Sequence, residues 1–174
     1  MQGYCEPFEG KKITLLGLGL LGRGVGDAEF LAKCGAELVV TDKKSEGELA
    51  ESVEKLRQDP NISFHLAKSV PDDFTKADMV IKAAGVPFDS PEIAAARAAG
   101  VPVYMSTALF AKYAIEAGAK IAGITGTRGK STVTQMIAHS LIRSNKRIVV
   151  GGNVRGISTL AQLPDVTHET IAVL

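Results

Sequence analysis

Short apolar runs alternate with longer segments of helical periodicity along the whole chain. Apolar runs of about five residues are typical of buried strands, and apolar residues three and four positions apart are typical of helices. Strands or strand-like apolar runs are predicted at residues 12–16, 37–41, 62–66, 78–83, 101–104, 121–124, 147–150 and 170–174. Helices are predicted at residues 20–34, 46–58, 91–99, 107–117, 132–143 and, more weakly, 158–163. This alternation predicts an α/β protein with a parallel sheet covered on both faces.

A joint between two domains is predicted at residues 116–120, where Gly118 ends one helix and a new strand begins. The first domain would span residues 1–118 and the second residues 119–174. Three strands and two helices are few for a nucleotide-binding domain, which needs a sizeable core and catalytic side chains at its strand ends. We therefore expect the second domain to be incomplete within this chain.

A glycine-rich segment, Gly123–Ser131, follows a predicted strand and leads into the helix at 132–143. Gly126 and Gly129 would let successive backbone N–H groups point at an anion. Lys130 would neutralise the β- and γ-phosphates, and the Ser131 hydroxyl would bind Mg²⁺. The sequence thus predicts a phosphate-binding loop for a nucleoside triphosphate, with Lys130 as its catalytic residue. The residues expected at the phosphates are Gly126, Thr127, Arg128, Gly129, Lys130, Ser131 and Thr132.

The helix after this loop carries apolar and small residues at helical spacing, which we expect to form its buried face. These residues are Val133, Met136, Ile137, Ser140 and Leu141.

A second glycine motif, Gly17-Leu-Gly19-Leu-Leu-Gly22, lies between the first predicted strand and the first predicted helix. Its spacing is that of the dinucleotide fingerprint, and Asp42 follows at the end of the second strand, where it could bind a ribose hydroxyl. The backbone N–H groups of such a turn recognise a diphosphate, not a particular base. NAD, another nucleotide diphosphate and a purely structural glycine turn all remain compatible with the motif.

Composition excludes fewer classes of function than these motifs do. The chain has 174 residues and a formal net charge of +1, which gives no electrostatic argument for nucleic acid or an anionic membrane. Its apolar stretches are too short to span a bilayer, and its start resembles no signal peptide, so we expect a cytoplasmic protein. Cys5 and Cys34 lack metal-ligand spacing and are expected to be free thiols. Three histidines also have no partners at metal or triad spacing and are expected to be surface or hydrogen-bonded structural residues: His65, His139 and His168.

The phosphate loop, Gly123-Ile-Thr-Gly-Thr-Arg-Gly-Lys-Ser-Thr132, resembles that of the Mur ligases and of their relatives, the folylpolyglutamate and cyanophycin synthetases. These enzymes join an amino acid to a carboxylate with ATP. The glycine fingerprint ahead of the loop extends the resemblance over most of the chain. Further matching segments are residues 40–42, 80–86, 106–110 and 151–154. The resemblance implies a Rossmann-like UDP-substrate domain followed by the start of a P-loop ATP-binding α/β domain.

Within the family, the chain most resembles the ligases that add D-glutamate to UDP-N-acetylmuramoyl-L-alanine in peptidoglycan precursor synthesis. The implied contacts are backbone N–H groups for the diphosphate, an acidic residue and its neighbour for uracil, and an asparagine for the sugar-peptide. In this chain those residues are Gly19, Leu20, Leu21, Asp42, Lys43, Gly85 and Asn153. The chain departs from the family where Ala83-Ala84-Gly85 replaces Ser-Pro-Gly and where Ala108 replaces an acidic residue.

The implied cofactors are ATP and Mg²⁺, and the implied reaction proceeds through an acyl phosphate that the amine of D-glutamate attacks. The family's second metal site and amino-acid-binding domain come later in its sequence, so residues 1–174 alone are expected to be inactive. We also expect a monomer acting on small molecules, without nucleic-acid or membrane partners. Two alternatives remain: the related ligase that adds L-alanine to UDP-N-acetylmuramate, and a stand-alone NAD- or nucleotide-binding module.

Overall fold

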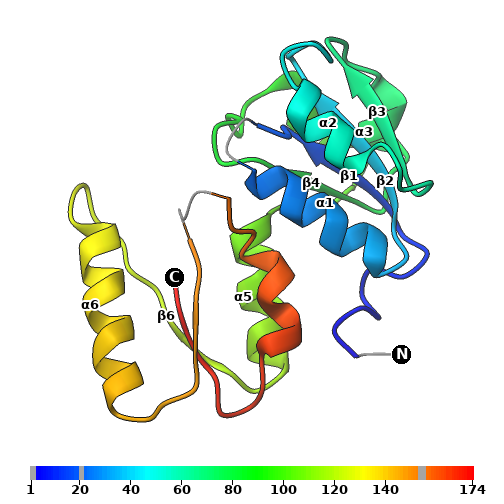
Figure 1. Ribbon diagram of the computed structural model, residues 1–174. Helices are drawn as coiled ribbons and strands as arrows, with labels where there is room; N and C mark the ends of the chain where they lie inside the picture. The colour runs from blue at the N-terminus through cyan, green and yellow to red at the C-terminus, as the bar shows by residue number, and fades with distance from the viewer. Residues whose placement is uncertain (1–2, 20–21, 153–155) are drawn as a thin grey trace.

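The computed structural model describes residues 3–19, 22–152 and 156–174, which form two parallel sheets (Figure 1). The strands of the first sheet, in spatial order, are β3 (Ile62–Leu66), β2 (Glu37–Asp42), β1 (Lys12–Leu16), β4 (Met79–Lys82) and β5 (Val103–Met105). The second sheet has the order β6 (Lys120–Ala122), β8 (Ile171–Val173) and β7 (Ile148–Val150). Neighbouring strands within each sheet are parallel, so the predicted α/β class is confirmed.

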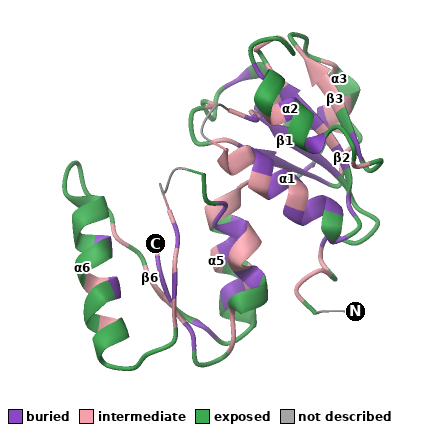
Figure 2. Ribbon diagram, in the orientation of Figure 1, coloured by how far each residue is buried: buried purple, intermediate pink, exposed green. Residues whose placement is uncertain are grey.

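Helices cover both faces of the first sheet because successive side chains of each strand point to opposite sides. Ile13 and Leu15 face a core shared with α1 (Arg23–Lys33), α2 (Ala50–Leu56) and α5 (Ser106–Glu116). Leu16 and Val80 face the other way, toward α3 (Pro71–Thr75) and α4 (Pro91–Ala98). Figure 2 shows the resulting buried layers on the helices and strands of this half.

The larger of the two cores continues from the first sheet into the second. Leu109 and Phe110 of α5 belong to the same buried cluster as Leu160, at the start of the 3₁₀ helix η1 (Leu160–Asp165), and Ala172 in β8. Figure 1 shows η1, in orange-red, lying beside α5. Tertiary packing therefore joins the two halves of the chain through α5 and η1.

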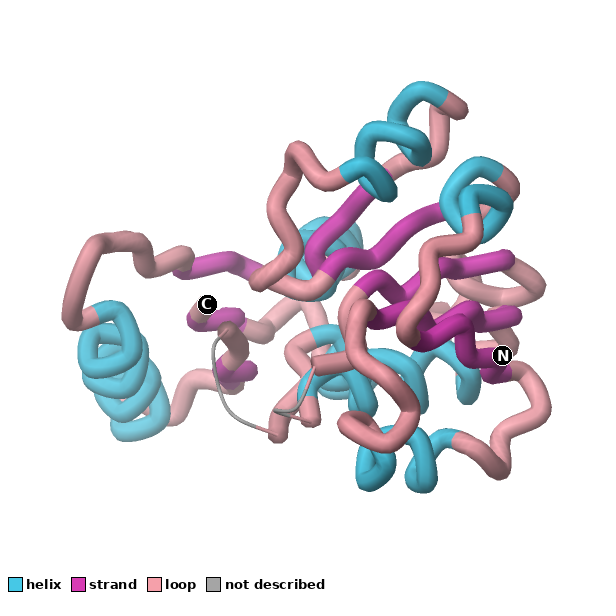
Figure 3. The backbone as a smooth tube through the Cα atoms, turned by 90° about the horizontal axis from the view of Figure 1, so that it is seen from above, coloured by secondary structure: helices cyan, strands magenta, loops and turns pink. Residues whose placement is uncertain are grey.

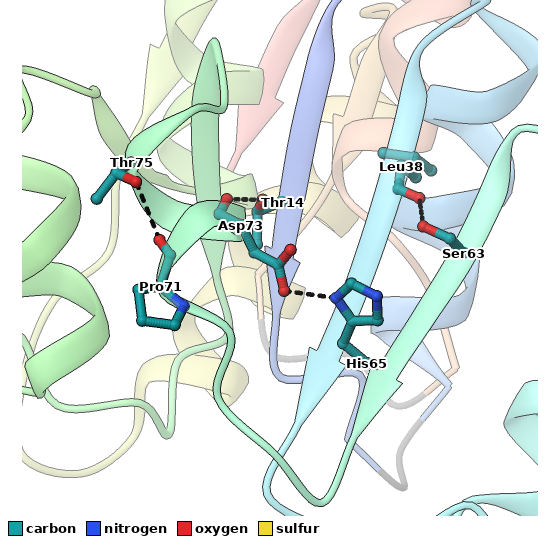
Figure 4. A network of polar contacts seen from close by, with 7 residues as sticks. All are labelled: Thr14, Leu38, Ser63, His65, Pro71, Asp73 and Thr75. Carbon is teal, nitrogen blue, oxygen red and sulfur yellow. Dashed lines mark hydrogen bonds and ion pairs between the residues drawn. The ribbon is translucent and has the colours of Figure 1, made fainter.

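A polar network attaches α3 to the first sheet (Figure 4). The Thr14 hydroxyl of β1 donates to the Asp73 carbonyl, and the Asp73 carboxylate lies 2.7 Å from Nδ1 of His65 in β3. The prediction that His65 is a satisfied structural histidine is confirmed. The helix α3 itself was not predicted, because its five residues contain a single buried apolar side chain, Phe74, and so show no helical periodicity.

The buried face of α6 (Lys130–Arg143) differs from the predicted one. Thr134 and Ala138 are the buried residues, whereas Val133 and Met136 are exposed by 43% and 65%. The main contacts of the helix are with β7 and β8 of the second sheet, and it lies at the edge of the molecule (Figures 1 and 3), so small residues suffice on its inner face. Among the described residues, no helix is both long and apolar enough to cross a membrane.

The prediction of two free thiols is wrong, since Cys5 and Cys34 form a disulfide. Cys34 ends α1, and the segment before β1 folds back across that end, with Phe8 packed edge-on against Phe30 of α1. This return of the chain brings together two cysteines that are 29 residues apart in sequence. Sequence spacing alone contains no signal for such a contact, because it depends on tertiary packing.

We expect reduction of this disulfide to lower the free energy of unfolding by about 3–4 kcal/mol, the entropy of closing a loop of this length in the unfolded chain. Urea denaturation with and without dithiothreitol measures the change. The Cys5→Ser variant is the control, because it has no disulfide and should not respond to the reductant. An equal response of the variant and the parent would contradict the assignment.

Candidate functional site

A cleft of about 420 Å³ lies at the carboxyl ends of β1, β2 and β4. The strand order places it beside the switch point of the first sheet, where the chain leaves β1 toward β2 on one side and β4 lies on the other. Open α/β sheets bind ligands in this position. The charged residues that line the cleft are Arg23, Asp27, Asp42, Lys43, Lys44, Lys82 and Glu92.

The turn from β1 into α1 forms the floor of the cleft and depends on glycine. Gly17 has φ +93°, and a Cβ atom built there would lie 2.9 Å from the Cβ atom of Ala83, after β4. Gly22, the N-cap of α1, has φ +78° and lies against the backbone of Gly156. Glycine in such a turn lets a ligand approach the backbone and the positive end of the helix dipole.

Asp42 ends β2 and connects the turn after β1 to the turn after β2. One carboxylate oxygen accepts the N–H of Gly19 at 3.2 Å, and the other accepts the N–H of Lys44 at 3.0 Å. The residue predicted to meet a ribose or a base thus also fixes the shape of the glycine turn.

Four of the residues predicted to bind the UDP substrate come together around this cleft, at the ends of three different strands. They are Gly19, Asp42, Lys43 and Gly85. The remaining predictions, Leu20, Leu21 and Asn153, lie outside the described residues. The residues that the resemblance implies for the diphosphate and for the base therefore line one cleft.

Five of the charged residues that line the cleft were not among the predicted site residues: Arg23, Asp27, Lys44, Lys82 and Glu92. Lys82 ends the apolar strand β4, and Asp27 lies on the inner face of α1 between Val25 and Ala28, so each breaks an apolar pattern and could have been noticed. Glu92 lies in the first turn of α4 after a proline, where acidic residues are common, and gave no such signal.

Asp27 connects α1 to the second half of the chain. It is 6% exposed and accepts a hydrogen bond from the Ser158 hydroxyl, two residues before η1. Burial raises the pKa of the Asp27 carboxyl, against the opposing effects of hydrogen bonds from Ser158 and Ser106 and the charge of Arg23. Because Asp27 also lines the cleft, it joins the candidate site to the contact between the two sheets.

The predicted phosphate loop has the expected strand–turn–helix geometry. It begins after β6 and ends at α6, whose N-cap Gly129 has φ +79°. The ammonium of Lys130 reaches back over the loop and donates to the Gly126 carbonyl at 2.6 Å. The N–H of Val133 makes the first backbone bond of the helix, to Gly129 at 2.9 Å, so the preceding N–H groups remain available to a ligand.

This loop and the cleft are separate features of the structure. The residues from Gly126 to Thr132 are exposed, and none of them lines the cleft. Among the described residues, no cluster of three or more His, Cys, Asp or Glu side chains could hold a metal ion. The exposed glycine-rich turn, its basic side chain and the free helix end nevertheless suit a phosphate group, whose oxygens would complete the coordination of a cation beside Ser131.

Comparison with known proteins identifies close sequence relatives. Residues 11–105 match the family described as Mur ligase MurD-like, N-terminal domain. The UDP-N-acetylmuramoylalanine–D-glutamate ligase of Roseiflexus sp. (strain RS-1) is 38% identical over 165 residues, covering 95% of this chain and 34% of the relative. The enzyme of the same name from Borreliella afzelii (strain PKo) is 38% identical over 157 residues, covering 90% and 33%. The chain thus spans about a third of the length of these relatives.

A solved structure supports the fold. The UDP-N-acetylmuramate:L-alanyl-gamma-D-glutamyl-meso-diaminopimelate ligase from Neisseria meningitides superimposes with a TM-score of 0.51 at 18% identity. The match covers 94% of this chain and 52% of that one. At this identity the likeness concerns the arrangement of strands and helices alone.

We expect Asp27→Asn to stabilise the protein at neutral pH by on the order of 1 kcal/mol, because it removes a buried charge and keeps an acceptor for Ser158. The raised pKa means that the folded protein binds more protons than the unfolded chain above the ordinary value of 3.8. The stability of the parent should therefore fall as pH rises through this window, and that slope should be smaller in the variant.

Urea denaturation at several pH values between 4 and 7 measures both effects. Glu169→Gln, which removes an exposed carboxylate, is the control and should follow the parent. A variant with the same pH slope as the parent would show that Asp27 does not titrate as its burial indicates.

Proposed function

The chain belongs to the Mur ligase family, with an N-terminal domain of the MurD-like type, and from that premise we propose that it serves the ATP-dependent addition of D-glutamate to UDP-N-acetylmuramoyl-L-alanine. The observation that supports this most strongly is the presence, in one chain, of the cleft beside the glycine turn and the separate phosphate loop. The proposed reaction uses ATP to activate the carboxylate of a UDP-linked substrate before the amino acid is added. It therefore needs one site for the nucleotide-sugar and another for ATP.

The cleft is proposed to hold the UDP part of the substrate. Backbone N–H groups of the turn after β1, together with the N-terminus of α1, would bind the diphosphate. Asp42, Lys43 and Gly85, which line the same cleft, would surround the uracil end. Leu20, Leu21 and Asn153 retain the roles expected from the family resemblance.

The phosphate loop is proposed to bind ATP. The backbone from Gly126 to Thr132 would surround the phosphates, and Lys130 would exchange its bond to the Gly126 carbonyl for the β- and γ-phosphate oxygens. Ser131 would contribute a hydroxyl ligand to Mg²⁺, which supplies charge neutralisation when bound. The extra cation of Arg128, where the family usually has asparagine or histidine, would add positive charge beside the phosphates.

The proposed chemistry activates a carboxylate, which is otherwise a poor electrophile. An oxygen of the alanyl carboxylate attacks the γ-phosphorus of ATP, ADP leaves, and an acyl phosphate remains. The uncharged amine of D-glutamate then attacks the acyl carbon, phosphate leaves, and the amine loses a proton to give the amide. Lys130 and the loop N–H groups stabilise the negative charge on the transferred phosphoryl group.

Several further features of the proposal follow from the family. D-Glutamate is preferred over L-alanine because both relatives described above carry D-glutamate in their names. We propose a monomeric cytoplasmic protein that acts on small molecules, with a domain division at residues 118 and 119.

We expect residues 1–174 to bind UDP at least about tenfold more tightly than NAD, a difference of roughly 1.4 kcal/mol. The second candidate function, an NAD-binding module, rests on the same glycine turn and strand order, so this comparison separates the two. Titration calorimetry measures both affinities. Tighter binding of NAD would contradict the ligase proposal.

We expect Lys130→Ala to lower D-glutamate-dependent ADP release by roughly 10²–10³-fold in the protein that carries this sequence, since one charged contact to the transferred phosphoryl group is lost. A coupled assay with UDP-N-acetylmuramoyl-L-alanine, ATP and Mg²⁺ measures the rate. UDP affinity should stay unchanged. Lys146→Ala, which removes an exposed lysine after the same helix, is the matched control. Activity near the parent rate in Lys130→Ala would exclude the proposed role of the loop.

A further inference from the structure

Two charged side chains line the cleft and have few hydrogen-bond partners for their polar atoms, Lys82 and Glu92. Lys82, at the end of β4, is 3% exposed, and its ammonium donates to the Ala83 carbonyl at 3.2 Å and lies 4.2 Å from the centre of the Phe88 ring. Oε2 of Glu92 is buried and, among the described residues, has no hydrogen-bond partner.

Such an arrangement is costly in the ligand-free protein. A buried ammonium has three donors, and here one of them has a protein acceptor. Burial accordingly lowers the pKa of Lys82. Within the described part of the chain, neither Lys82 nor Glu92 forms an ion pair within 4.0 Å, so the two charges do not compensate each other directly. Buried polar groups that lack partners in the free protein are candidates for contacts with a ligand.

The position of the two residues indicates which part of a ligand they would meet. Lys82 lies directly beside Leu16 in the sheet, next to the start of the glycine turn. Glu92 lines the cleft and also a smaller neighbouring hollow that it shares with Asp42 and Lys43. Leu16, the sheet neighbour of Lys82, lines that hollow as well. Glu92 therefore lies at the end of the cleft that Asp42 and Lys43 border, where the base of a nucleotide would lie, and Lys82 lies next to this end through its neighbour Leu16.

The two groups have opposite hydrogen-bonding character. An ammonium only donates and an ionised carboxylate only accepts. A base edge that satisfies both must present a carbonyl oxygen next to a ring N–H. Uracil has this edge in its carbonyl groups and N3–H, whereas N3 of cytosine is an acceptor and would face the carboxylate unfavourably.

We propose that Lys82 and Glu92 recognise the imide edge of uracil, with Lys82 donating to a carbonyl oxygen and Glu92 accepting from N3–H. This inference rests on the proposed function, since it concerns the base of the same UDP substrate. It also accounts for base recognition in a chain where Ala83-Ala84 replaces the family's Ser-Pro and so lacks that hydroxyl. A site with buried groups matched to one edge discriminates strongly against a ligand that leaves them unpaired.

The test compares UDP with CDP, which share the ribose and diphosphate and differ at this edge. Titration calorimetry of the parent should show UDP binding at least about tenfold more tightly than CDP. Glu92→Gln should lose most of that preference, because an amide can accept from uracil or donate to N3 of cytosine. Glu51→Gln, an exposed carboxylate in the first turn of α2, is the matched control and should keep the preference.

Lys82→Met keeps the length of the side chain and removes its donors, so it should weaken UDP binding about tenfold. Circular dichroism and thermal unfolding establish that each variant is folded. A parent that binds UDP but has the same UDP-to-CDP ratio as Glu92→Gln would overturn this inference and leave the proposed function standing. A parent that binds neither nucleotide would overturn both.

Discussion

The close approach of backbone at the end of β1 is the constraint on which the rest of this structure depends. At Gly17, in the turn after β1, an added Cβ atom would lie 2.9 Å from the Cβ of Ala83, which follows β4. At Gly24, in the first turn of α1, it would lie 2.2 Å from the carbonyl oxygen of Leu18, so side chains are excluded at both positions. This closeness sets α1 against the sheet and leaves the ends of β1, β2 and β4 open around one cleft. The same absence of side chains makes the backbone accessible to a diphosphate.

Glycine residues also allow close packing at the N-terminal half of α1. Gly22 and Gly26, one turn apart, let the segment from Gly156 to Ser158 pack closely against the helix, and Asp27 adds a hydrogen bond to Ser158. The cleft and the second sheet thus meet at one helix.

The fold was largely predictable because strands and helices that bury one face repeat their apolar residues with a fixed period. That argument failed where an element is short or packs weakly. The helix α3 buries only Phe74, and α6 turns Thr134 and Ala138 inward while Met136 stays exposed. A periodic pattern shows which residues could share a face, but the face that is buried depends on what the helix packs against.

The sequence by itself determined the α/β class, the two glycine motifs and the position of four predicted residues around one cleft, because these follow from local spacing and from the rule that parallel strands end at the same edge. Tertiary structure alone decided three further matters: the pairing of Cys5 with Cys34, the contact of Asp27 with Ser158, and the presence of Lys82 and Glu92 in the cleft. Each of these joins residues from different elements, at positions set by how helices pack on the sheet. No local pattern encodes such distances, because burial and unsatisfied hydrogen-bonding groups exist only once the chain has folded.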